Sequence, residues 1–408
     1  MMGESGLTGR TKQSFVGVRS EGGPSERGAP QRKHVFLIGV FLAAIFGVGL
    51  SQAAVELARG RWPGVLDLFR KAPSEANLRA LEKQLDEACW LAPAVRRAVQ
   101  LAQFVVLADC GEKAVAGRNG WLFYRPEVQY LVERWPAPGG PAADPGDPLA
   151  AIVDFRDQLA SRGIKLLVVP APNKASVYPE MLCAGAGSAG RPVNPATRKI
   201  LSELARAGIE VVDLFEVFAR AKAEGGSAGS APLYLAQDTH WSPDGMRLAA
   251  EAVAERLLER GWIERGKVPY EVKPVPISRR GDVLAMIRNP WIERLFPAEE
   301  MVCAQVVSAD RREPYRDDPG SPVLVLGDSF LRIYQGDEPG SAGFIAHLAR
   351  EIGLPVASLV NDGGASTLVR QELYRRPELL AGKRVVVWEF VERDLRFGTE
   401  GWQKIPLR

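Results

Sequence analysis

Residues 323–329 read VLVLGDS, four aliphatic residues followed by glycine, aspartate and serine. A short continuous aliphatic run that ends in turn residues is typical of a strand buried on both faces of a sheet. Similar runs occur elsewhere in the chain, at residues 165–169 (KLLVV), 210–214 (EVVDL), 356–360 (VASLV) and 384–388 (RVVVW). Patterns with helical periodicity separate them, at residues 149–162, 196–207, 244–260, 344–352 and 368–374. This alternation predicts the α/β class, with a mainly parallel sheet and helices on both of its faces.

Ser329 closes the opening stretch and follows its predicted strand directly. Catalytic groups of open parallel sheets gather on the loops at the carboxyl ends of the strands. Gly327 permits a tight turn there, which would expose the serine hydroxyl. The alternative is that Asp328 or Ser329 merely caps a turn or a helix. Ser329 is therefore a candidate nucleophile, and its assignment depends on finding a general base elsewhere in the chain.

The chain contains three histidines that could act as this base. His34 adjoins a long apolar segment, and His347 lies in an apolar helical pattern, FIAHLAREI, which favours a structural role. His240 is the remaining candidate, within the polar segment QDTHWSPDG at residues 237–245. Scattered histidines and the lack of a Cys-x-x-Cys pair disfavour a metal site, so we expect neither a metal nor a cofactor.

Asp238 lies two residues before His240. A curved loop would let its carboxylate accept the imidazole Nδ1–H and leave Nε2 free to take a proton from a serine. Asp238, His240 and Ser329 together supply the orienting acid, the base and the nucleophile of an acyl-transfer triad, if the fold brings both loops together. The alternative is a structural Asp–His pair beside a packing Trp241.

Residues 34–55 give the strongest topological signal, because positions 35–55 lack any charged residue and approach the about 20 residues that a bilayer requires. Arg32 and Lys33 precede this segment, so the positive-inside bias places residues 1–33 in the cytoplasm. We therefore expect a single-pass type II signal-anchor in the inner (cytoplasmic) membrane. A buried core helix and a signal peptide cleaved at the small residues near 51–53 are the alternatives.

The net charge of +3 has a local origin. Residues 1–33 contain six basic and three acidic side chains, so the other 375 residues carry 46 charges of each sign. The basic start, rich in glycine and serine, predicts a disordered cytoplasmic tail. The neutral remainder argues against nucleic-acid binding, which requires a basic face on the folded part.

The part expected outside the cytoplasm divides into a helical membrane-proximal segment, residues 56–110, and a periplasmic catalytic domain, residues 111–408. It contains all four cysteines. An even number in an oxidising compartment permits two disulfides in three connectivities, and four unpaired thiols are the alternative. The cysteine positions are 89, 110, 183 and 303.

The Gly-Asp-Ser and Asp-x-His motifs are hallmarks of SGNH-type hydrolases, which usually place the serine first. The reversed order found here, with several local strings, resembles the alginate O-acetyltransferase family of periplasmic SGNH-like proteins. The matching strings cover about residues 110–396 and are GWLFY at 120–124, PAPNK at 170–174, YPE at 178–180, DTHWSP at 238–243, GDS at 327–329, WEF at 388–390 and ER at 392–393.

The resemblance implies an SGNH-like fold in which Ser329 is the nucleophile, His240 the base and Asp238 its orienter. It also implies substrate contacts around Arg393, in the loop after the last strand. Some members carry a C-terminal carbohydrate-binding module. We expect none here, because the sequence resembles the membrane-anchored members instead.

The donors of the oxyanion hole are less clearly indicated by the resemblance. Asp394 stands where family members can carry a tyrosine that helps to form the hole. Backbone N–H groups of Ser329 and of the loop containing Asn361, Gly363 and Gly364 are the substitutes. The glycine pair could equally belong to an ordinary turn.

These features imply O-acetylation of an exported, alginate-like polysaccharide acceptor through an acetyl-serine intermediate. The same groups with water as the acceptor would give a periplasmic carbohydrate acetylesterase. A non-catalytic polysaccharide-binding scaffold is the third reading. Acetyl-CoA stays in the cytoplasm, so the transferase reading requires a membrane-embedded partner protein that supplies acetyl groups.

Overall fold

The computed structural model describes residues 29–70, 74–132, 146–186, 194–224 and 231–408. Residues 1–28 of the expected cytoplasmic tail lie outside this part. The chain divides into two compact units, residues 1–96 and residues 97–408.

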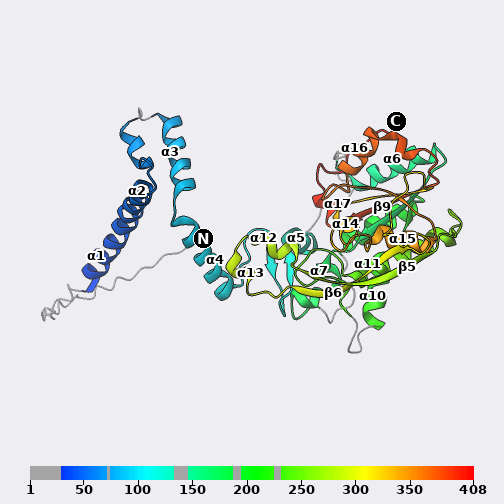
Figure 1. Ribbon diagram of the computed structural model, residues 1–408, viewed down its shortest axis with the longest axis horizontal. Coiled ribbons are helices and arrows are strands. Elements are labelled where there is room, and N and C mark those ends of the chain that lie inside the picture. The colour runs from blue at the N-terminus through cyan, green and yellow to red at the C-terminus, as the bar shows by residue number, and fades with distance from the viewer. Residues whose placement is uncertain (1–28, 71–73, 133–145, 187–193, 225–230) are drawn as a thin grey trace, which may run out of the picture. The chain divides into compact units, whose positions relative to one another are not determined.

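The first unit contains the apolar segment expected to span a membrane. Helix α1 (Ala29–Leu42), a π-helical turn (Ala43–Gly47) and helix α2 (Val48–Ala58) follow one another as a continuous rod (Figure 1). Within it, an 18-residue window of His34–Ala58 has a mean hydropathy of 2.2, so this helix is long and apolar enough to cross a bilayer. Apolar side chains along this rod are exposed, as a lipid-facing surface requires.

A short helical return follows the rod. It comprises a 3₁₀ turn (Gly64–Phe69), helix α3 (Glu75–Ala88) and the start of helix α4 (Ala92–Leu107). The buried side-chain amide of Gln52 holds this return. Its Nε2 donates to the Ala88 carbonyl at 2.9 Å, and its Oε1 accepts the Trp90 N–H at 3.0 Å. Burial of an amide is tolerated there because both of its ends are hydrogen-bonded.

The second unit is built on a five-stranded parallel sheet with the order β4-β3-β9-β7-β8. Two adjacent strands of this sheet, residues 323–327 and 385–391, are buried at every position, which explains their continuous aliphatic runs in the sequence. The strands are β3 (Lys165–Ala171), β4 (Glu210–Val211), β7 (Val323–Gly327), β8 (Ala357–Val360) and β9 (Val385–Val391).

Helices cover both faces of this sheet. One face packs on α10 (Leu214–Glu224), α11 (Pro243–Glu259) and α15 (Phe344–Ile352) through residues such as Val325 and Val387. The other face packs on α6 (Pro148–Ala160), α9 (Pro195–Arg206) and α16 (Leu368–Arg375) through residues such as Leu324 and Trp388. The predicted α/β class, the parallel sheet and its two helical layers are therefore confirmed.

Two antiparallel elements were not predicted. A hairpin pairs β1 (Ala114–Ala116) with β2 (Leu122–Tyr124), and a ribbon pairs β5 (Tyr270–Arg279) with β6 (Glu299–Ser308) over ten residues each. Pro274 and Pro276 argue against a strand at β5, but a two-stranded ribbon has free edges where proline loses no hydrogen bond.

Short elements complete the second unit and occupy its loops. They are α5 (Arg125–Val132), α7 (Lys174–Val177), α8 (Pro179–Leu182), α12 (Asp282–Met286), α13 (Pro290–Glu293), α14 (Ser329–Arg332), a 3₁₀ turn (Pro377–Leu380) and α17 (Asp394–Phe397).

Three sequence expectations need adjustment. The strand expected at 210–214 has only two residues, because the Asp213 carboxylate accepts the N–H groups of Phe215 and Glu216 and so starts α10. The compact unit begins at Arg97 and not at residue 111, because Phe104 of α4 packs on it, with its ring 6.0 Å from that of Phe296. All four cysteines lie in the described part, and each is a free thiol, so the two-disulfide alternative is wrong here.

The core of the sheet gives a stability prediction. Leu324 is fully buried between β7 and the α6–α9–α16 layer. Leu324→Ala should lower the free energy of unfolding by about 2–5 kcal/mol, because the lost side chain leaves a cavity. Leu295→Ala removes the same atoms from a side chain that is 56% exposed and should change it by less than about 0.5 kcal/mol. Denaturant unfolding of the detergent-solubilised chain, followed by tryptophan fluorescence, measures both; equal losses would contradict the assigned core.

Candidate active site

Ser329 lies at the carboxyl end of β7, as the first residue of α14. A side chain on Gly327 would collide with the Glu389 carboxylate and with Leu331, so only glycine fits there. Asp328 caps the helix, since its Oδ1 accepts the Phe330 N–H at 2.9 Å. The Gly-Asp-Ser motif thus turns the chain sharply from strand to helix and places the serine at the turn.

His240 lies in the loop that precedes α11. Tyr234 and Trp241 form an isolated antiparallel bridge that closes this loop at its base. Trp241 is fully buried, and its ring lies 5.0 Å from that of Phe330, the residue after Ser329. Ser242 then caps α11 by accepting the Gly245 N–H at 3.2 Å. Most of the DTHWSP string is therefore occupied in fixing this loop against the serine turn.

The three predicted triad residues form a hydrogen-bonded series in which His240 contacts both Asp238 and Ser329. His240 Nδ1 is 2.6 Å from Asp238 Oδ1, and His240 Nε2 is 2.8 Å from Ser329 Oγ. Asp238 Oδ1 also accepts the His240 backbone N–H at 3.1 Å. Asp238 is fully buried and His240 is 4% exposed, so water competes little for either contact. The arrangement can remove a proton from the serine and hold the resulting imidazolium.

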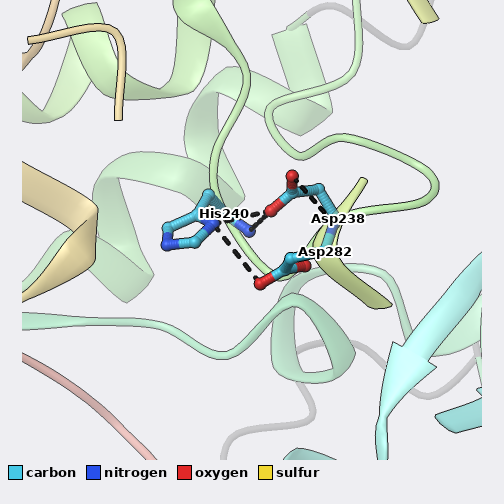
Figure 2. A group of neighbouring side chains, drawn as sticks. All are labelled: Asp238, His240 and Asp282. Atoms are coloured by element: carbon cyan, nitrogen blue, oxygen red, sulfur yellow. Dashed lines mark hydrogen bonds and ion pairs between the residues drawn. The ribbon is translucent and has the colours of Figure 1, made fainter. Parts of the chain in front are cut away.

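Two further charged residues surround Asp238, and the sequence analysis missed both. Arg279, the last residue of β5, donates from Nε to Asp238 Oδ2 at 3.1 Å. Asp282 lies beside the pair, with Oδ2 3.8 Å from His240 Nδ1 (Figure 2). Its oxygens accept the Thr239 N–H and Oγ1–H, each at 2.7 Å. Neither residue belongs to a recognisable local motif. Arg279 ends β5 and Asp282 begins α12, and neither of these elements was predicted.

Charge in this cluster fixes the protonation of the base. Burial alone would raise the pKa of Asp238, but the contacts with His240 and Arg279 hold that pKa well below its usual range. Burial alone would lower the pKa of His240, but Asp238, Asp282 and Asp328 raise it above its ordinary value of 6.5. His240 is therefore a stronger base than a free imidazole, because the neighbouring carboxylates stabilise its protonated form.

Asp238, His240 and Asp282 are also close enough to be considered as metal ligands, with their nearest ligand atoms within 4.8 Å of one another (Figure 2). Each oxygen of Asp238 already accepts two hydrogen bonds. Both oxygens of Asp238 and both oxygens of Asp282 accept hydrogen bonds, and Asp238 is paired with the Arg279 guanidinium. This donor set suits a hydrogen-bonded triad and not a cation.

The loop proposed as an oxyanion donor does not offer two of its predicted N–H groups. The Asn361 N–H donates to the Gly327 carbonyl at 3.0 Å, and the Gly364 N–H donates to the Asn361 carbonyl at 2.9 Å. Gly363 has a φ of +66° and makes the tight turn between them. The expectation for Asn361 and Gly364 as backbone donors is therefore wrong in this structure, because the loop uses these groups to form its own turn.

Arg393 is near the site but faces the protein. Its Nη1 is 2.9 Å from the Oε1 of the fully buried Glu127, and its side chain is only 12% exposed. The guanidinium also lies 6.0 Å from the ring of Phe330 and 5.4 Å from that of Tyr124. Arg393 is therefore largely buried beside the serine turn and paired with Glu127, and its expected contact with substrate remains a prediction.

His347 has the structural role favoured by its sequence pattern. It is buried in α15, and its Nε2 lies 2.9 Å from the Ala304 carbonyl oxygen. Burial lowers the pKa of His347 to about 4, so it stays neutral near pH 7.

Comparisons with known proteins show which family this chain resembles. A family model described as "SGNH hydrolase-like domain, acetyltransferase AlgX" matches residues 114–392. Probable alginate O-acetylase AlgJ of Azotobacter vinelandii is 24% identical over 325 residues, which cover 78% of each chain. Probable alginate O-acetylase AlgJ of Pseudomonas aeruginosa is 27% identical over 303 residues, 70% of this chain and 71% of that one. The solved O-acetyltransferase domain of Pseudomonas putida AlgJ has the same fold, with a TM-score of 0.52, 23% identity and coverage of 69% and 91%.

The raised pKa of His240 predicts how the reactivity of Ser329 depends on pH. His240 accepts a proton only when neutral, so labelling of Ser329 by phenylmethanesulfonyl fluoride should fall on acidification with a midpoint above 6.5. Asp282→Asn removes one carboxylate beside Nδ1 that raises the pKa of His240, and should move this midpoint down. Mass spectrometry of the labelled peptide gives the profile, and Ser329→Ala is the blank. A midpoint at or below 6.5 in the unmodified chain would contradict the described electrostatics.

Proposed function

The chain belongs to the family of SGNH hydrolase-like acetyltransferases described by the AlgX model, and we propose that it O-acetylates an exported, alginate-like polysaccharide through acetyl-Ser329. The observation that carries the proposal is the hydrogen-bonded series from Asp238 through His240 to Ser329 Oγ. The names of its AlgJ relatives support alginate as the acceptor class.

In the first half-reaction His240 Nε2 takes the proton of Ser329 as Oγ attacks the carbonyl carbon of an acetyl ester or thioester. A tetrahedral oxyanion forms, and its collapse breaks the bond to the leaving oxygen or sulfur. The imidazolium returns its proton to that leaving group, which departs as an alcohol or a thiol. Asp238 stabilises the imidazolium throughout and keeps its own charge.

In the second half-reaction a sugar hydroxyl occupies the place of the departed group. His240 removes its proton as the sugar oxygen attacks acetyl-Ser329, and the proton passes to Ser329 Oγ when the acyl bond breaks. The products are the acetylated sugar and the free serine. The N–H of Ser329, at the first position of α14 where no intrahelical acceptor exists, is the oxyanion donor that this geometry favours.

The rod of α1 and α2 supports a membrane-bound form of this enzyme. We assign His34–Ala58 as a signal-anchor, with the Arg32–Lys33 side in the cytoplasm and residues 97–408 in the periplasm. An exported polymer is accessible there, whereas acetyl-CoA is not. The donor must then be an acetyl group passed across the membrane by a second, membrane-embedded protein.

Complementation tests the function in cells. In a strain that lacks the corresponding gene, Ser329→Ala should reduce acetyl groups on the exported polysaccharide by about 100-fold or more, because no covalent intermediate can form. Ser202→Ala is the matched control, since Ser202 is exposed on α9 and remote from the triad, and it should restore wild-type acetylation. Proton NMR of the polymer and immunoblots of membranes measure product and enzyme level. Wild-type acetylation by Ser329→Ala would overturn the proposal.

The response to an added acceptor sugar distinguishes acetyl transfer from the acetylesterase alternative. The purified full chain in detergent, given a chromogenic acetyl ester, should release less free acetate and form acetylated sugar when an oligouronate is added. Release of acetate that does not respond to any glycan acceptor would favour hydrolysis over transfer.

A further inference from the structure

Lys174 is a buried cation that the proposed mechanism leaves unused. It ends the PAPNK string, begins α7 and is fully buried. Its Nζ donates to the backbone carbonyls of Leu235 and Ala236, each at 3.1 Å, and of Asp238 at 2.6 Å. A further contact reaches the Leu122 carbonyl in β2. Three of these four acceptors thus belong to the segment that ends at the orienting acid of the triad.

A carboxylate binds the N–H groups of the same segment. Glu299, the first residue of β6, accepts the Ala236 N–H on Oε2 and the Gln237 N–H on Oε1, both at 2.8 Å. The carbonyl oxygens of segment 235–238 therefore bind an ammonium group, and two of its N–H groups bind a carboxylate. Charge-assisted hydrogen bonds of this kind are about twice as strong as neutral ones.

Close packing restricts the segment further. A side chain on Gly281 would collide with the Gln237 carbonyl and with the Asp238 nitrogen, so the backbone at Gly281 lies directly against the loop. The next residue, Asp282, donates its own N–H to Asp238 Oδ2 at 3.2 Å. Because Gly281 and Asp282 block movement in their direction, a shift of residues 235–238 must break the contacts with Lys174 or with Glu299.

The surroundings of Lys174 keep it charged. The rings of Trp121 and Phe123, from the GWLFY string, lie 5.6 Å and 5.1 Å from Nζ. The carboxylates of Glu127, Asp238, Asp282 and Glu299 also act on the ammonium. Burial still lowers the pKa of Lys174 to about 8, so most of the amine is protonated at pH 7.

We propose that Lys174 and Glu299 are positioning residues that hold the 235–238 segment between them and thereby fix Asp238 against His240. This inference rests on the proposed catalytic triad and assigns a purpose to the PAPNK string. Neither residue touches the reacting atoms. Their effect reaches the serine only through Asp238, so it appears in turnover and in the pKa of the base, and not in substrate affinity.

The test uses the full chain in detergent and its turnover of a chromogenic acetyl ester. Lys174→Met keeps the length of the side chain and removes its charge and donors. We expect kcat to fall about 100-fold with KM within about twofold, as for a small misplacement of a catalytic group. Glu299→Gln keeps the shape of the carboxylate but lets it accept only one of the two N–H groups, and kcat should fall about tenfold.

The acid limb of kcat/KM distinguishes positioning from general loss of structure. When Asp238 is displaced, His240 loses its main stabilising charge, so the midpoint should move down toward 6.5 in both variants. Partial unfolding would lower kcat/KM by the same factor at every pH and leave the midpoint unchanged. Lys383→Met is the matched control, because Lys383 is a buried lysine bonded to the Pro319 carbonyl at the opposite end of the sheet, and its profile should equal that of the unmodified chain.

Three results decide the outcome. A folded Lys174→Met protein with unchanged kcat and midpoint overturns the inference. If Lys174→Met does not fold, Glu299→Gln decides alone, and an unchanged kcat and midpoint in that variant overturns it equally. Ser329→Ala is measured beside them. Full turnover by that protein refutes the triad itself. If Ser329→Ala is inactive but the Lys174 and Glu299 variants behave as the unmodified chain, only the positioning role of Lys174 and Glu299 is refuted.

Discussion

The hydrogen bond between His240 Nε2 and Ser329 Oγ, 2.8 Å long, joins two loops 89 positions apart in the chain, and the rest of the site is arranged so that it can form. The parallel sheet places Ser329 at the end of β7, and the buried contact of Trp241 with Phe330 brings the histidine loop to it. The geometry of a contact between two loops depends on how firmly the backbone of each loop is held. Gly327 fixes one side by close packing, and the Tyr234–Trp241 bridge fixes the other.

Burial of so many charges near one hydroxyl requires compensation. Burial raises the pKa of Glu127 and of Asp394 to about 7 and raises the pKa of Asp328 and, strongly, that of Glu389. Arg393 pairs with Glu127, and its charge acts against burial on the pKa of all four acids. With pKa values of about 7, Glu127 and Asp394 are partly protonated near neutrality and carry less than a full negative charge each. The interior behind Ser329 therefore opposes a developing oxyanion less than its acid content suggests.

The sequence predicted the parts of this structure that depend on local pattern. Aliphatic runs marked four strands closely, and the Gly-Asp-Ser and Asp-x-His strings named the three residues that meet. It failed where the information is tertiary. The β5–β6 ribbon contains Pro274 and Pro276 and has no hydrophobic alternation, so Arg279 at its end could not be placed beside Asp238. Asp282 begins the short helix α12, which also has no local signal. Nothing local in the sequence shows that Arg393 pairs with the buried Glu127, 266 positions away along the chain.

The account depends most on Ser329 carrying the acetyl group between donor and acceptor. The most direct measurement is intact-mass and peptide mass spectrometry of the full chain, mixed rapidly with an isotopically labelled acetyl ester and then chased with an oligouronate. The account predicts a labelled acetyl adduct on Ser329 that disappears in the chase as the same label appears on the oligosaccharide. Labelled oligosaccharide without any adduct at Ser329, or an adduct that decays only to free acetate, would contradict it.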